Sequence, residues 1–506
     1  MPECRPVLIL GGGINGASIA RELALNHVPV VLVDKADIGS GATAYSSRLI
    51  HGGVRYLEYG DFQLVKESLA ERTRLLQNAP DFVKPLRLHI PVVSRWGGTW
   101  QTMRRMAGMD RPDRPTRARG LRLVQAGLWC YDAFARDRSL PRHTTQRREE
   151  SGVPHLNTLY RWVCAYTDAQ MVAPERFVVA LLQDAEHFAM AHGERFDVLT
   201  YHDATLQDQS VTLRDRSGNT TCELKPELII NASGAWVDQT LQQLSVTAPR
   251  LIGGTKGSHF VSHHPKLIAA LDGRGIYAEA QDGRPVFMLP FGDAALVGTT
   301  DVRFEQPPQH ATASEEELEY LIAAANQVFP DLNLNREAVA HHYAGIRPLP
   351  FSRAKRTAAV SRRHTLHPHA CAELPMVSVI GGKLTTCRSL AEETVAQVLP
   401  QIDRQVAANS RDREIPERAP DWKRAVDAPA RLQEIIQTEW VQTIEDLVER
   451  RLLLLNDPNL SRQTLRKLAE ALVHAGRLGD RDVETAVARC QQRLLQHFGK
   501  TLVDSD

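Results

Sequence analysis

Cysteine is scarce in this chain, which has seven cysteines in 506 residues and no Cys-x-x-Cys pair. An odd and scattered set argues against a disulfide framework and against a zinc site, so we expect a reducing compartment and no bound metal. The sequence also lacks a run of about 18 apolar residues, which a membrane-spanning helix needs. No cationic and apolar leader precedes the first apolar strand, so we expect no secretory signal and a cytoplasmic protein.

Net charge is nearly absent as well, because 61 lysines and arginines face 60 aspartates and glutamates. No overall positive field therefore favours nucleic acid as a partner. Basic charge is concentrated in residues 104–122, which hold seven arginines and two aspartates. Two interpretations of this stretch stay open: contact with anionic lipid headgroups, or a solvated surface insertion that contains Pro112 and Pro115.

The clearest motif that is present lies in residues 7–34. An apolar strand pattern leads into the turn GGGING, a helical pattern follows, and a second apolar strand ends in Asp34. Gly11 permits the tight turn, Gly13 lets a pyrophosphate approach the backbone, and Gly16 lets helix and strand pack closely. The pyrophosphate then lies on the helix N-terminus. Asp34 can accept hydrogen bonds from both ribose hydroxyls and repels a 2′-phosphate, so the motif predicts FAD or NAD rather than NADP.

Two further strand-to-helix turns carry small residues. The apolar run at residues 228–231 is followed by Ala-Ser-Gly, and the run at 377–380 is followed by Gly-Gly-Lys. Small residues at the carboxyl end of a strand let a cofactor lie close to the backbone. Three such turns, far apart in the sequence, predict one cofactor domain that is assembled from separate segments.

The pattern elsewhere predicts two other domains. Apolar and polar positions alternate over residues 255–305, as in an antiparallel sheet. Prolines and charges at 411–422 indicate a linker, and apolar residues recur at helical spacing from residue 423 onward. We therefore expect an α/β fold with three parts. These are a discontinuous Rossmann-like cofactor domain (1–75, 150–235 and 345–395), an antiparallel-sheet substrate domain (76–149 and 236–344) and a C-terminal helical domain (411–506).

Six blocks of the sequence resemble those of a known family and occur in the family's order. They are residues 11–17, 46–58, 256–259, 297–301, 345–349 and 381–386. Through them the chain is similar to the FAD-dependent glycerol-3-phosphate dehydrogenases, which belong to the D-amino-acid-oxidase-like flavoproteins. The block SSRLIHGGVRYLE at 46–58 is the most specific, because it is far longer than a cofactor fingerprint. Residues 443–451 also resemble the family's C-terminal helical domain.

The resemblance implies FAD as the cofactor and an enzyme that oxidises sn-glycerol 3-phosphate to dihydroxyacetone phosphate. It implies that a hydride passes from C2 of the substrate to flavin N5, and that a quinone at a membrane surface receives the electrons. The residues assigned to FAD by the motifs and the resemblance are Gly11, Gly13, Asn15, Gly16, Asp34, Ser46, Ser47, His51, Gly52, Ser233, Gly234, Gly382, Lys383, Leu384 and Thr385.

A phosphorylated substrate needs fixed cations, and guanidinium groups suit a phosphate well. The residues assigned to substrate binding are Arg55, Tyr56, Thr299, Thr300 and Arg362, and those assigned to catalysis are His259, Arg347 and Lys383. We expect His259 to take the hydroxyl proton, and Lys383 to hold the substrate or stabilise the reduced flavin. A histidine in a strand is more often structural, however, and Arg362 beside Arg363 also fits a plain basic surface.

Three alternatives stay open at the level of the sequence. An oxidase of the same substrate would pass its electrons to oxygen, and the sequence does not separate it from a quinone-linked dehydrogenase. A related flavoenzyme would act on a 2-hydroxy acid or an amino acid and would recognise a carboxylate. The third alternative is a flavin-binding scaffold without turnover. Peripheral binding at the inner face of the cell membrane and assembly as a homodimer are further expectations.

Overall fold

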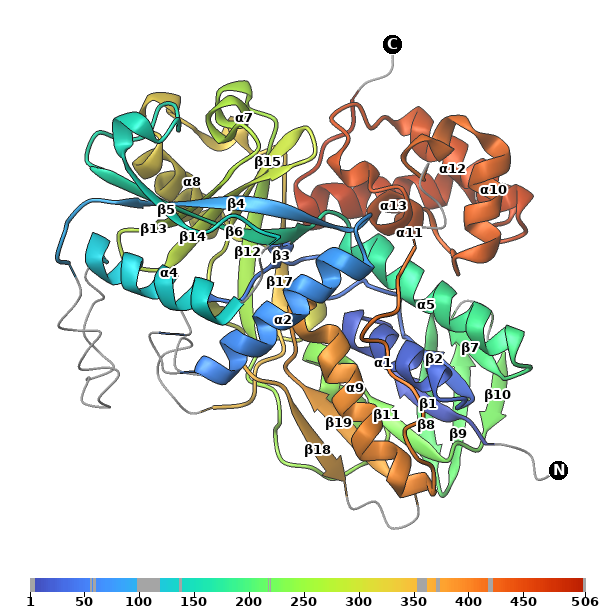
Figure 1. Cartoon of the computed structure of the whole chain (residues 1–506). Coiled ribbons are helices and arrows are strands. Elements are labelled where there is room, and N and C mark those ends of the chain that lie inside the picture. The colour runs from blue at the N-terminus through green and yellow to red at the C-terminus, as the bar shows by residue number, and fades with distance from the viewer. Residues whose placement is uncertain are drawn as a thin grey trace.

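The computed structural model describes the chain at residues 5–54, 57, 61–97, 119–135, 139–216, 218, 220–352, 362–369, 374–416 and 422–503. Two expected substrate-binding residues, Arg55 and Tyr56, lie outside these ranges, as does most of the arginine-rich stretch at 104–122. Figure 1 shows how the described elements are arranged in space.

Among the described residues, six strands form the sheet that contains the first strand of the chain. Their order is β18 (Thr365–His369), β19 (Met376–Ile380), β11 (Leu228–Asn231), β1 (Val7–Leu10), β2 (Val30–Val33) and β7 (Phe196–Leu199). Neighbouring strands run parallel from β19 to β7, and β18 is an antiparallel edge strand. All four side chains of β1 are buried, as expected for a continuous apolar run in a sheet that is covered on both faces.

Helices cover one face of this sheet and a small sheet covers the other. Helix α1 (Ile14–Leu25) connects β1 to β2 and packs against α5 (Pro174–Ala191) and α9 (Cys387–Val398). Val7 and Ile9 belong to the apolar core on this side, whereas Leu8 and Leu10 belong to the core on the other side. The elements on that second side are β8 (His202–Gln207), β9 (Ser210–Asp215), β10 (Thr221–Leu224) and α6 (Val237–Gln243).

The second large sheet has ten strands in the ranges that the structure describes, and it is mostly antiparallel. Its main order is β16 (Val302–Arg303), β12 (Thr255–Ser262), β15 (Ala294–Gly298), β14 (Pro285–Phe291), β13 (Gly275–Glu279), β4 (Val83–Val92), β6 (Trp162–Met171) and β3 (Leu49–Ile50). Strand β17 (His341–Arg347) also pairs with β12, and β5 (Thr144–Arg147) with β6. The alternating pattern of residues 255–305 thus forms antiparallel strands, as expected.

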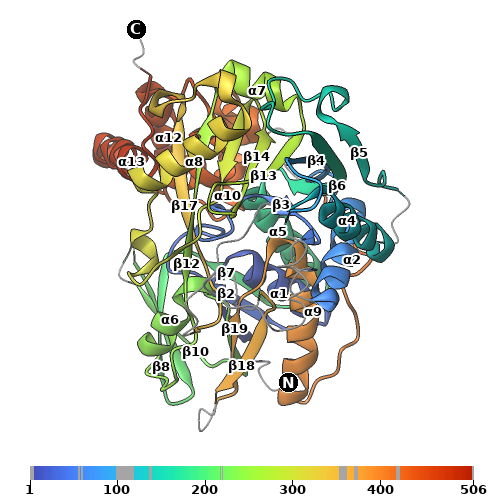
Figure 2. The same ribbon diagram turned by 90° about the vertical axis from the view of Figure 1, so that its left-hand side faces the viewer.

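Helices flank the ten-stranded sheet too. α7 (Pro265–Leu271) and α8 (Glu315–Val328) contact β14 and β15, while α2 (Phe62–Asn78) and α4 (Leu121–Ala135) contact β6. A capping box fixes the start of α8: the Ser314 hydroxyl accepts from the backbone N–H of Glu317, and the Glu317 carboxylate accepts from that of Ser314. In the two perpendicular views of Figures 1 and 2, α7 and α8 lie in the upper part of the molecule and the six-stranded sheet in the lower part.

The expected ranges of the cofactor domain, 1–75, 150–235 and 345–395, contain all six strands of the first sheet. They also contain β3 and β6, which pair in the ten-stranded sheet. The sequence pattern could not place these two strands, because an apolar run carries no signal of which sheet it joins. The three domain ranges remain a proposal, and they assign β3 and β6 to the cofactor domain although both strands pair within the ten-stranded sheet.

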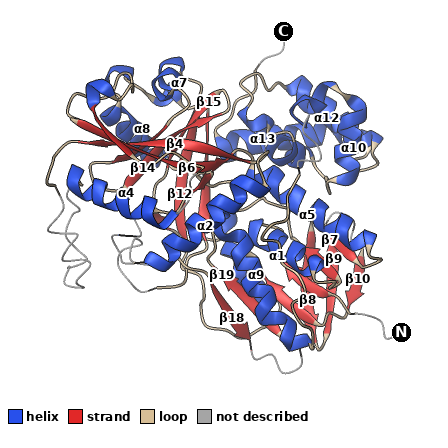
Figure 3. Cartoon of the chain, viewed as in Figure 1, coloured by secondary structure: helices blue, strands red, loops and turns tan. Residues whose placement is uncertain are grey.

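Helices form most of the C-terminal region, as Figure 3 shows. They are α10 (Pro429–Thr438), α11 (Ile444–Asp446), α12 (Arg462–His474) and α13 (Val483–Phe498), and a π-helical turn, Leu447–Arg451, continues α11. This turn contacts α5 and α13 contacts β17, so the region touches both halves of the molecule. In the part of the chain that the structure describes, no helix is both long and apolar enough to cross a bilayer.

Short 3-10 turns connect many of these elements. They cover Arg148–Glu150, Gly234–Trp236, Pro308–His310, Pro330–Leu332, Arg336–Ala338, Leu384–Thr386, Leu399–Ile402, Trp422–Asp427, Leu454–Asn456 and Asp480–Asp482. Two of them, Gly234–Trp236 and Leu384–Thr386, directly follow small-residue turns that the sequence singled out, and both lead into helices.

Candidate active site

A cavity of 1460 Å³ lies between the two large sheets. Leu10, Val33, Ala232 and Gly381, each at or just beyond the carboxyl end of a parallel strand, line one side of it. Residues of β14 and β17 and of the segment after β15 line the other side. The carboxyl edge of a parallel sheet is where α/β proteins bind ligands, so the position alone favours a cofactor site.

The glycine-rich turn has the geometry that a pyrophosphate requires. Gly11 has a φ of +110°, and a Cβ there would lie 2.7 Å from the carbonyl oxygen of Ala232. A Cβ on Gly13 would meet only Thr43 Oγ1, at 3.5 Å, so the space beside its backbone is open. A Cβ on Gly16 would lie 1.9 Å from the Gly11 carbonyl oxygen, and Gly16 does not line the cavity. Gly16 therefore serves helix packing, as its place in the motif predicts.

Asp34 stands at the end of β2 with its carboxylate held in place. Its two oxygens accept from the backbone N–H of Gly12 at 2.7 Å and of Ala36 at 2.9 Å. Burial raises the pKa of Asp34 to about 6, although both hydrogen bonds act in the opposite direction. Each carboxylate oxygen has further acceptor capacity for a ribose hydroxyl. The turn and the acid together fit a dinucleotide.

The segment after β2 connects the first turn to the third. Ser46, Ser47 and His51 line the cavity, and the His51 N–H donates to Thr385 Oγ1 at 3.2 Å. Burial lowers the pKa of His51 to about 3, and the nearby cations Lys383 and Arg362 add to the effect. Gly52 does not line the cavity. Its N–H donates to the Tyr131 hydroxyl at 2.8 Å.

The third turn is tied to the first by Asn15. Its side-chain amide donates to the carbonyl of Gly381 at 3.1 Å, and a Cβ on Gly382 would lie 2.4 Å from the Asn15 amide nitrogen. Both glycines have positive φ, at +83° and +95°, so only glycine fits here without strain. Asn15, Gly382, Lys383, Leu384 and Thr385 all line the cavity, as do Ser233 and Gly234 of the second turn.

Cations and hydroxyls gather where the cavity meets the ten-stranded sheet. Arg347, Arg362 and Thr299 line the cavity there, and Lys383 lines it from the third turn. Arg347 donates to Thr299 Oγ1 at 2.9 Å and to the Asp301 carboxylate at 3.1 Å, and Arg362 lies 3.9 Å from the other oxygen of that carboxylate. Sequence reasoning missed Asp301 as a site residue, although it ends a block that resembles the family. Its charge sets the two guanidinium groups side by side.

Thr300 lines the cavity, but its hydroxyl is used by the fold. It donates to the Glu317 carboxylate at 2.7 Å and accepts from the backbone N–H of Ser258 at 2.9 Å. Glu317 is also paired with Lys256 of β12 at 2.7 Å. The expected hydrogen bond from Thr300 to substrate therefore competes with contacts that attach α8 to β12. The Thr299 hydroxyl lies beside the cations: it accepts from Arg347 at 2.9 Å and donates to the Thr300 carbonyl at 3.1 Å.

His259 lies behind the cavity wall rather than on it. It is buried on β12, its ring stacks on Tyr343 at 5.0 Å, and its Nε2 lies 2.8 Å from Ser47 Oγ. Burial lowers its pKa to about 3, with smaller contributions from Arg347 and Arg48. The histidine is therefore neutral at physiological pH, and it reaches the cavity through the Ser47 hydroxyl. The sequence contained both residues but gave no sign of this pairing across 212 positions.

Two further cations of the cavity wall, Arg48 and Lys35, make contacts that hold them in place. Arg48 forms a buried ion pair with Glu175, at 2.5 Å, and Lys35 lies 4.9 Å above the ring of Trp236, which lines the cavity. Within the described ranges, no three histidine, cysteine, aspartate or glutamate side chains come together as a metal site requires.

The sheets, the dinucleotide turn and the cationic cavity together define a dinucleotide-binding oxidoreductase. The chain belongs to the FAD dependent oxidoreductases, the family whose model matches residues 6–388, and its cofactor is FAD. It is 34% identical over 430 residues to a glycerol-3-phosphate dehydrogenase of Synechocystis, an alignment that covers 79% of this chain and 70% of that protein.

Two other similarities bear on the site. The chain is 32% identical over 410 residues to D-erythritol 1-phosphate dehydrogenase of Brucella abortus, covering 79% of this chain and 75% of that one. It also shares the fold of the glycerol-3-phosphate dehydrogenase from Bacillus halodurans complexed with FAD. The TM-score is 0.71 at 19% identity, and the match covers 100% of this chain and 97% of that one. The shared fold therefore includes the C-terminal helices.

Proposed function

We propose that this enzyme oxidises sn-glycerol 3-phosphate to dihydroxyacetone phosphate and passes the electrons to a quinone at a membrane surface. The observation that carries the substrate class is the cationic end of the cavity. Arg347 and Arg362 face the two oxygens of the Asp301 carboxylate, and Lys383 lines the same cavity. Planar guanidinium groups with fixed geometry suit a phosphomonoester dianion. The similarity to a named glycerol-3-phosphate dehydrogenase supports the same substrate.

The chain's own residues then have distinct tasks. Arg347 and Arg362 hold the phosphate, and the Thr299 hydroxyl turns away from the Thr300 carbonyl to donate a neutral hydrogen bond beside them. Ser47 receives the proton of the C2 hydroxyl and relays it to Nε2 of His259. Lys383 holds the substrate oxygen or stabilises the negative charge of the reduced cofactor. FAD, when bound, supplies at N5 the acceptor for the hydride that leaves C2.

A membrane surface as the site of electron delivery is supported by exposed aromatic side chains near α4. Trp96 is 67% exposed and Trp129 is 68% exposed, and the Arg122 guanidinium lies 6.0 Å from the Trp96 ring centre. Tryptophan and arginine favour the headgroup region of a bilayer. We propose that the protein binds the membrane peripherally through this face. We also propose that it is a homodimer in solution, which light scattering would check.

D-erythritol 1-phosphate is a second candidate substrate, because the relative of that name is almost as similar over the same share of the chain. It presents the same phosphate to Arg347 and Arg362. D-erythritol 1-phosphate is longer than glycerol 3-phosphate by one hydroxylated carbon. The end of the molecule opposite the phosphate must therefore fit in the cavity away from Arg347 and Arg362. A 2-hydroxy acid or amino acid would meet the same cations with a carboxylate of lower charge.

The activity is tested with purified holoprotein and a panel of these substrates, with a soluble quinone analogue or oxygen as acceptor. The proposal predicts the highest kcat/KM for sn-glycerol 3-phosphate with quinone, and little hydrogen peroxide in air. Higher kcat/KM with D-erythritol 1-phosphate would reassign the substrate, and rapid peroxide formation would identify an oxidase. Sedimentation with anionic vesicles tests the membrane face: Trp96→Ala and Trp129→Ala should weaken binding, whereas Met190→Ala, equally exposed on α5, should not.

A further inference from the structure

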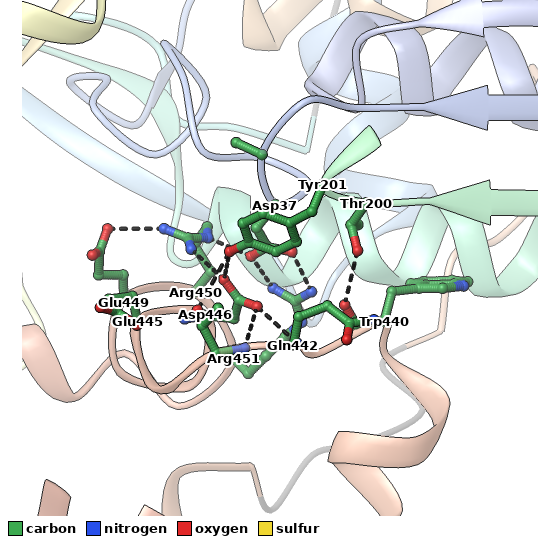
Figure 4. A network of polar contacts seen from close by, with 12 residues as sticks. Asp37, Thr200, Tyr201, Trp440, Gln442, Glu445, Asp446, Glu449, Arg450 and Arg451 are labelled. Atoms are coloured by element: carbon green, nitrogen blue, oxygen red, sulfur yellow. Dashed lines mark hydrogen bonds and ion pairs between the residues drawn. The ribbon is translucent and has the colours of Figure 1, made fainter. Parts of the chain in front are cut away.

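Buried ionic side chains join the cofactor site to the C-terminal region, as Figure 4 shows. The segment at residues 34–48, here called the cofactor loop, follows β2 and supplies many residues of the cavity wall. These include Asp34, Ser40, Gly41, Thr43, Ser46 and Ser47. Asp37 lies in the same loop but is absent from the cavity wall. It is fully buried and instead faces Arg450 and Arg451 of the C-terminal π-helical turn.

Asp37 is bonded by both arginines. Arg451 donates from its two terminal nitrogens to the two carboxylate oxygens, at 2.7 and 2.8 Å, and Arg450 donates from Nε at 2.5 Å. Arg451 also donates twice to the carbonyl of Glu439, so its guanidinium cannot turn without breaking several contacts. Burial alone would raise the pKa of Asp37, but the two guanidinium groups lower it below its usual value. The carboxylate is therefore charged and fixed.

A second contact holds the other end of the cofactor loop. The Tyr45 hydroxyl donates to Glu449 at 3.3 Å, and Glu449 is itself paired with Arg450 at 2.8 Å and with Arg493. The Tyr45 ring packs beside Phe498 of α13. Asp37 and Tyr45 thus attach the loop to the C-terminal region on either side of the cavity-lining residues 40–43.

The inner side of the same loop is bonded to the glycine-rich turn. Thr43 Oγ1 accepts from the backbone N–H of Ile14 at 3.0 Å, which is the first residue of α1. The Gly39 N–H donates to the Gly12 carbonyl at 2.9 Å, and Asp34 accepts from the Gly12 N–H. The position of the loop therefore sets both the ribose-binding carboxylate and the surroundings of the helix N-terminus that receives the pyrophosphate.

Stability alone is a weak reason for such a cluster, because replacing a buried ion pair with apolar side chains is often neutral or stabilising. Ion pairs with two-pronged geometry do specify one arrangement of the groups that they join. We propose that Asp37, Arg450 and Arg451 are positioning residues for FAD: docking of the C-terminal region holds the cofactor loop in its FAD-binding conformation. This inference depends on FAD as the cofactor and is independent of the proposed substrate.

The test compares full-length holoproteins that carry Arg451→Lys, Tyr45→Phe or the control Arg489→Lys. Arg451→Lys keeps the positive charge but cannot donate from two nitrogens to the two Asp37 oxygens, and Tyr45→Phe removes one hydroxyl. Arg489 pairs with Glu445 in the same region but does not touch the loop. The rate of FAD release is followed by the rise in flavin fluorescence. Loss of a residue that orients a metal ligand weakens metal binding about tenfold or more, and we use this as the scale for a residue that orients a cofactor-binding group. We therefore expect release about tenfold faster for Arg451→Lys, a smaller increase for Tyr45→Phe, and no change for the control.

Hydrogen exchange separates positioning from a general loss of stability. The proposal predicts faster exchange in peptides that cover residues 34–48 in Arg451→Lys and Tyr45→Phe, with β1 and the part of α1 after its first turn unchanged. A lower melting temperature with unchanged FAD release and unchanged loop exchange would overturn it, because the ion pairs would then serve stability alone. Should Arg451→Lys fail to fold, Tyr45→Phe decides the question by the same two measurements, since it changes a single hydroxyl.

Discussion

Ser47 Oγ and Nε2 of His259 lie 2.8 Å apart, with the serine on the cavity wall and the histidine behind it. In the proposed mechanism this contact would give a buried base access to a substrate hydroxyl without exposing the imidazole to solvent. Burial keeps the ring neutral, and Arg347 adds to that effect through its charge. In the proposed mechanism a phosphate bound at Arg347 would offset this second contribution, so substrate binding would make His259 a stronger base.

Ser47→Ala should lower kcat on the order of a hundredfold and leave KM nearly unchanged, because it removes a proton-transfer step and no phosphate contact. Steady-state kinetics with sn-glycerol 3-phosphate measures both constants. Ser389→Ala is the matched control, since its hydroxyl donates to Glu67 outside the cavity. A kcat within twofold of wild type for Ser47→Ala would remove Ser47 from the proton path.

Acid should destabilise the protein partly through His259. Its pKa is about 3 in the folded state and 6.5 for the ordinary residue, so the unfolded chain binds more protons between these values. The contribution is therefore complete above pH 6.5 and is lost as the pH falls toward 3. The free energy of unfolding therefore falls by about 2 kcal/mol, through His259 alone, when the pH is lowered from about 7.5 to about 5.

Urea unfolding at these two pH values measures that loss. His259→Gln should show a free energy of unfolding that falls less between them than that of wild type. His474→Gln, a substitution at an exposed histidine, is the control. Equal pH dependence in wild type and His259→Gln would show that His259 is not buried in its neutral form.

Arg347→Ala should lose about 2–5 kcal/mol of substrate binding or transition-state stabilisation, because it takes away a two-pronged phosphate ligand. Most of the loss should appear in kcat/KM. Arg250→Ala is the control, since Arg250 pairs with Glu305 at an exposed position. Near-normal kcat/KM in Arg347→Ala would place the phosphate elsewhere in the cavity.

FAD affinity should weaken as the pH falls through about 6, the value to which burial raises the pKa of Asp34. Below it the carboxyl is protonated and loses acceptor capacity for the ribose hydroxyls. Asp34→Ala should reduce flavin occupancy at all pH values, and Asp34→Asn should abolish the pH dependence. Equilibrium titration of apoprotein with FAD measures this, with Asp197→Asn on β7 as the control. An unchanged affinity in Asp34→Ala would show that the ribose contact is assigned wrongly.

Local features of this protein could be predicted from the sequence, and long-range pairings could not. The turn at Gly11 and the acid at Asp34 follow from spacing within one strand-helix-strand unit, because their geometry is set by neighbours in the chain. The strand β6 could not be placed, since its apolar residues fit either sheet. The contact between Asp37 and Arg451 joins residues 414 positions apart. Nothing in a run of charged residues such as 445–451 indicates that they are buried.

Resemblance to a family predicted some of the residues that come together from distant parts of the chain. It placed Arg347 and Lys383 on one cavity, which spacing alone could not do, and it placed His259 close to the site. It did not indicate that Ser47 stands between His259 and the cavity, or that the Thr300 hydroxyl is used by Glu317. Such details depend on side-chain packing between elements that are distant in the chain.

The central claim is that this flavoprotein oxidises sn-glycerol 3-phosphate. Anaerobic mixing of the purified holoprotein with this substrate, followed by flavin absorbance, tests it most directly. The account predicts rapid loss of the visible flavin absorbance and its return when a quinone analogue is added. Unchanged absorbance in a holoprotein that dithionite still reduces would contradict the substrate assignment.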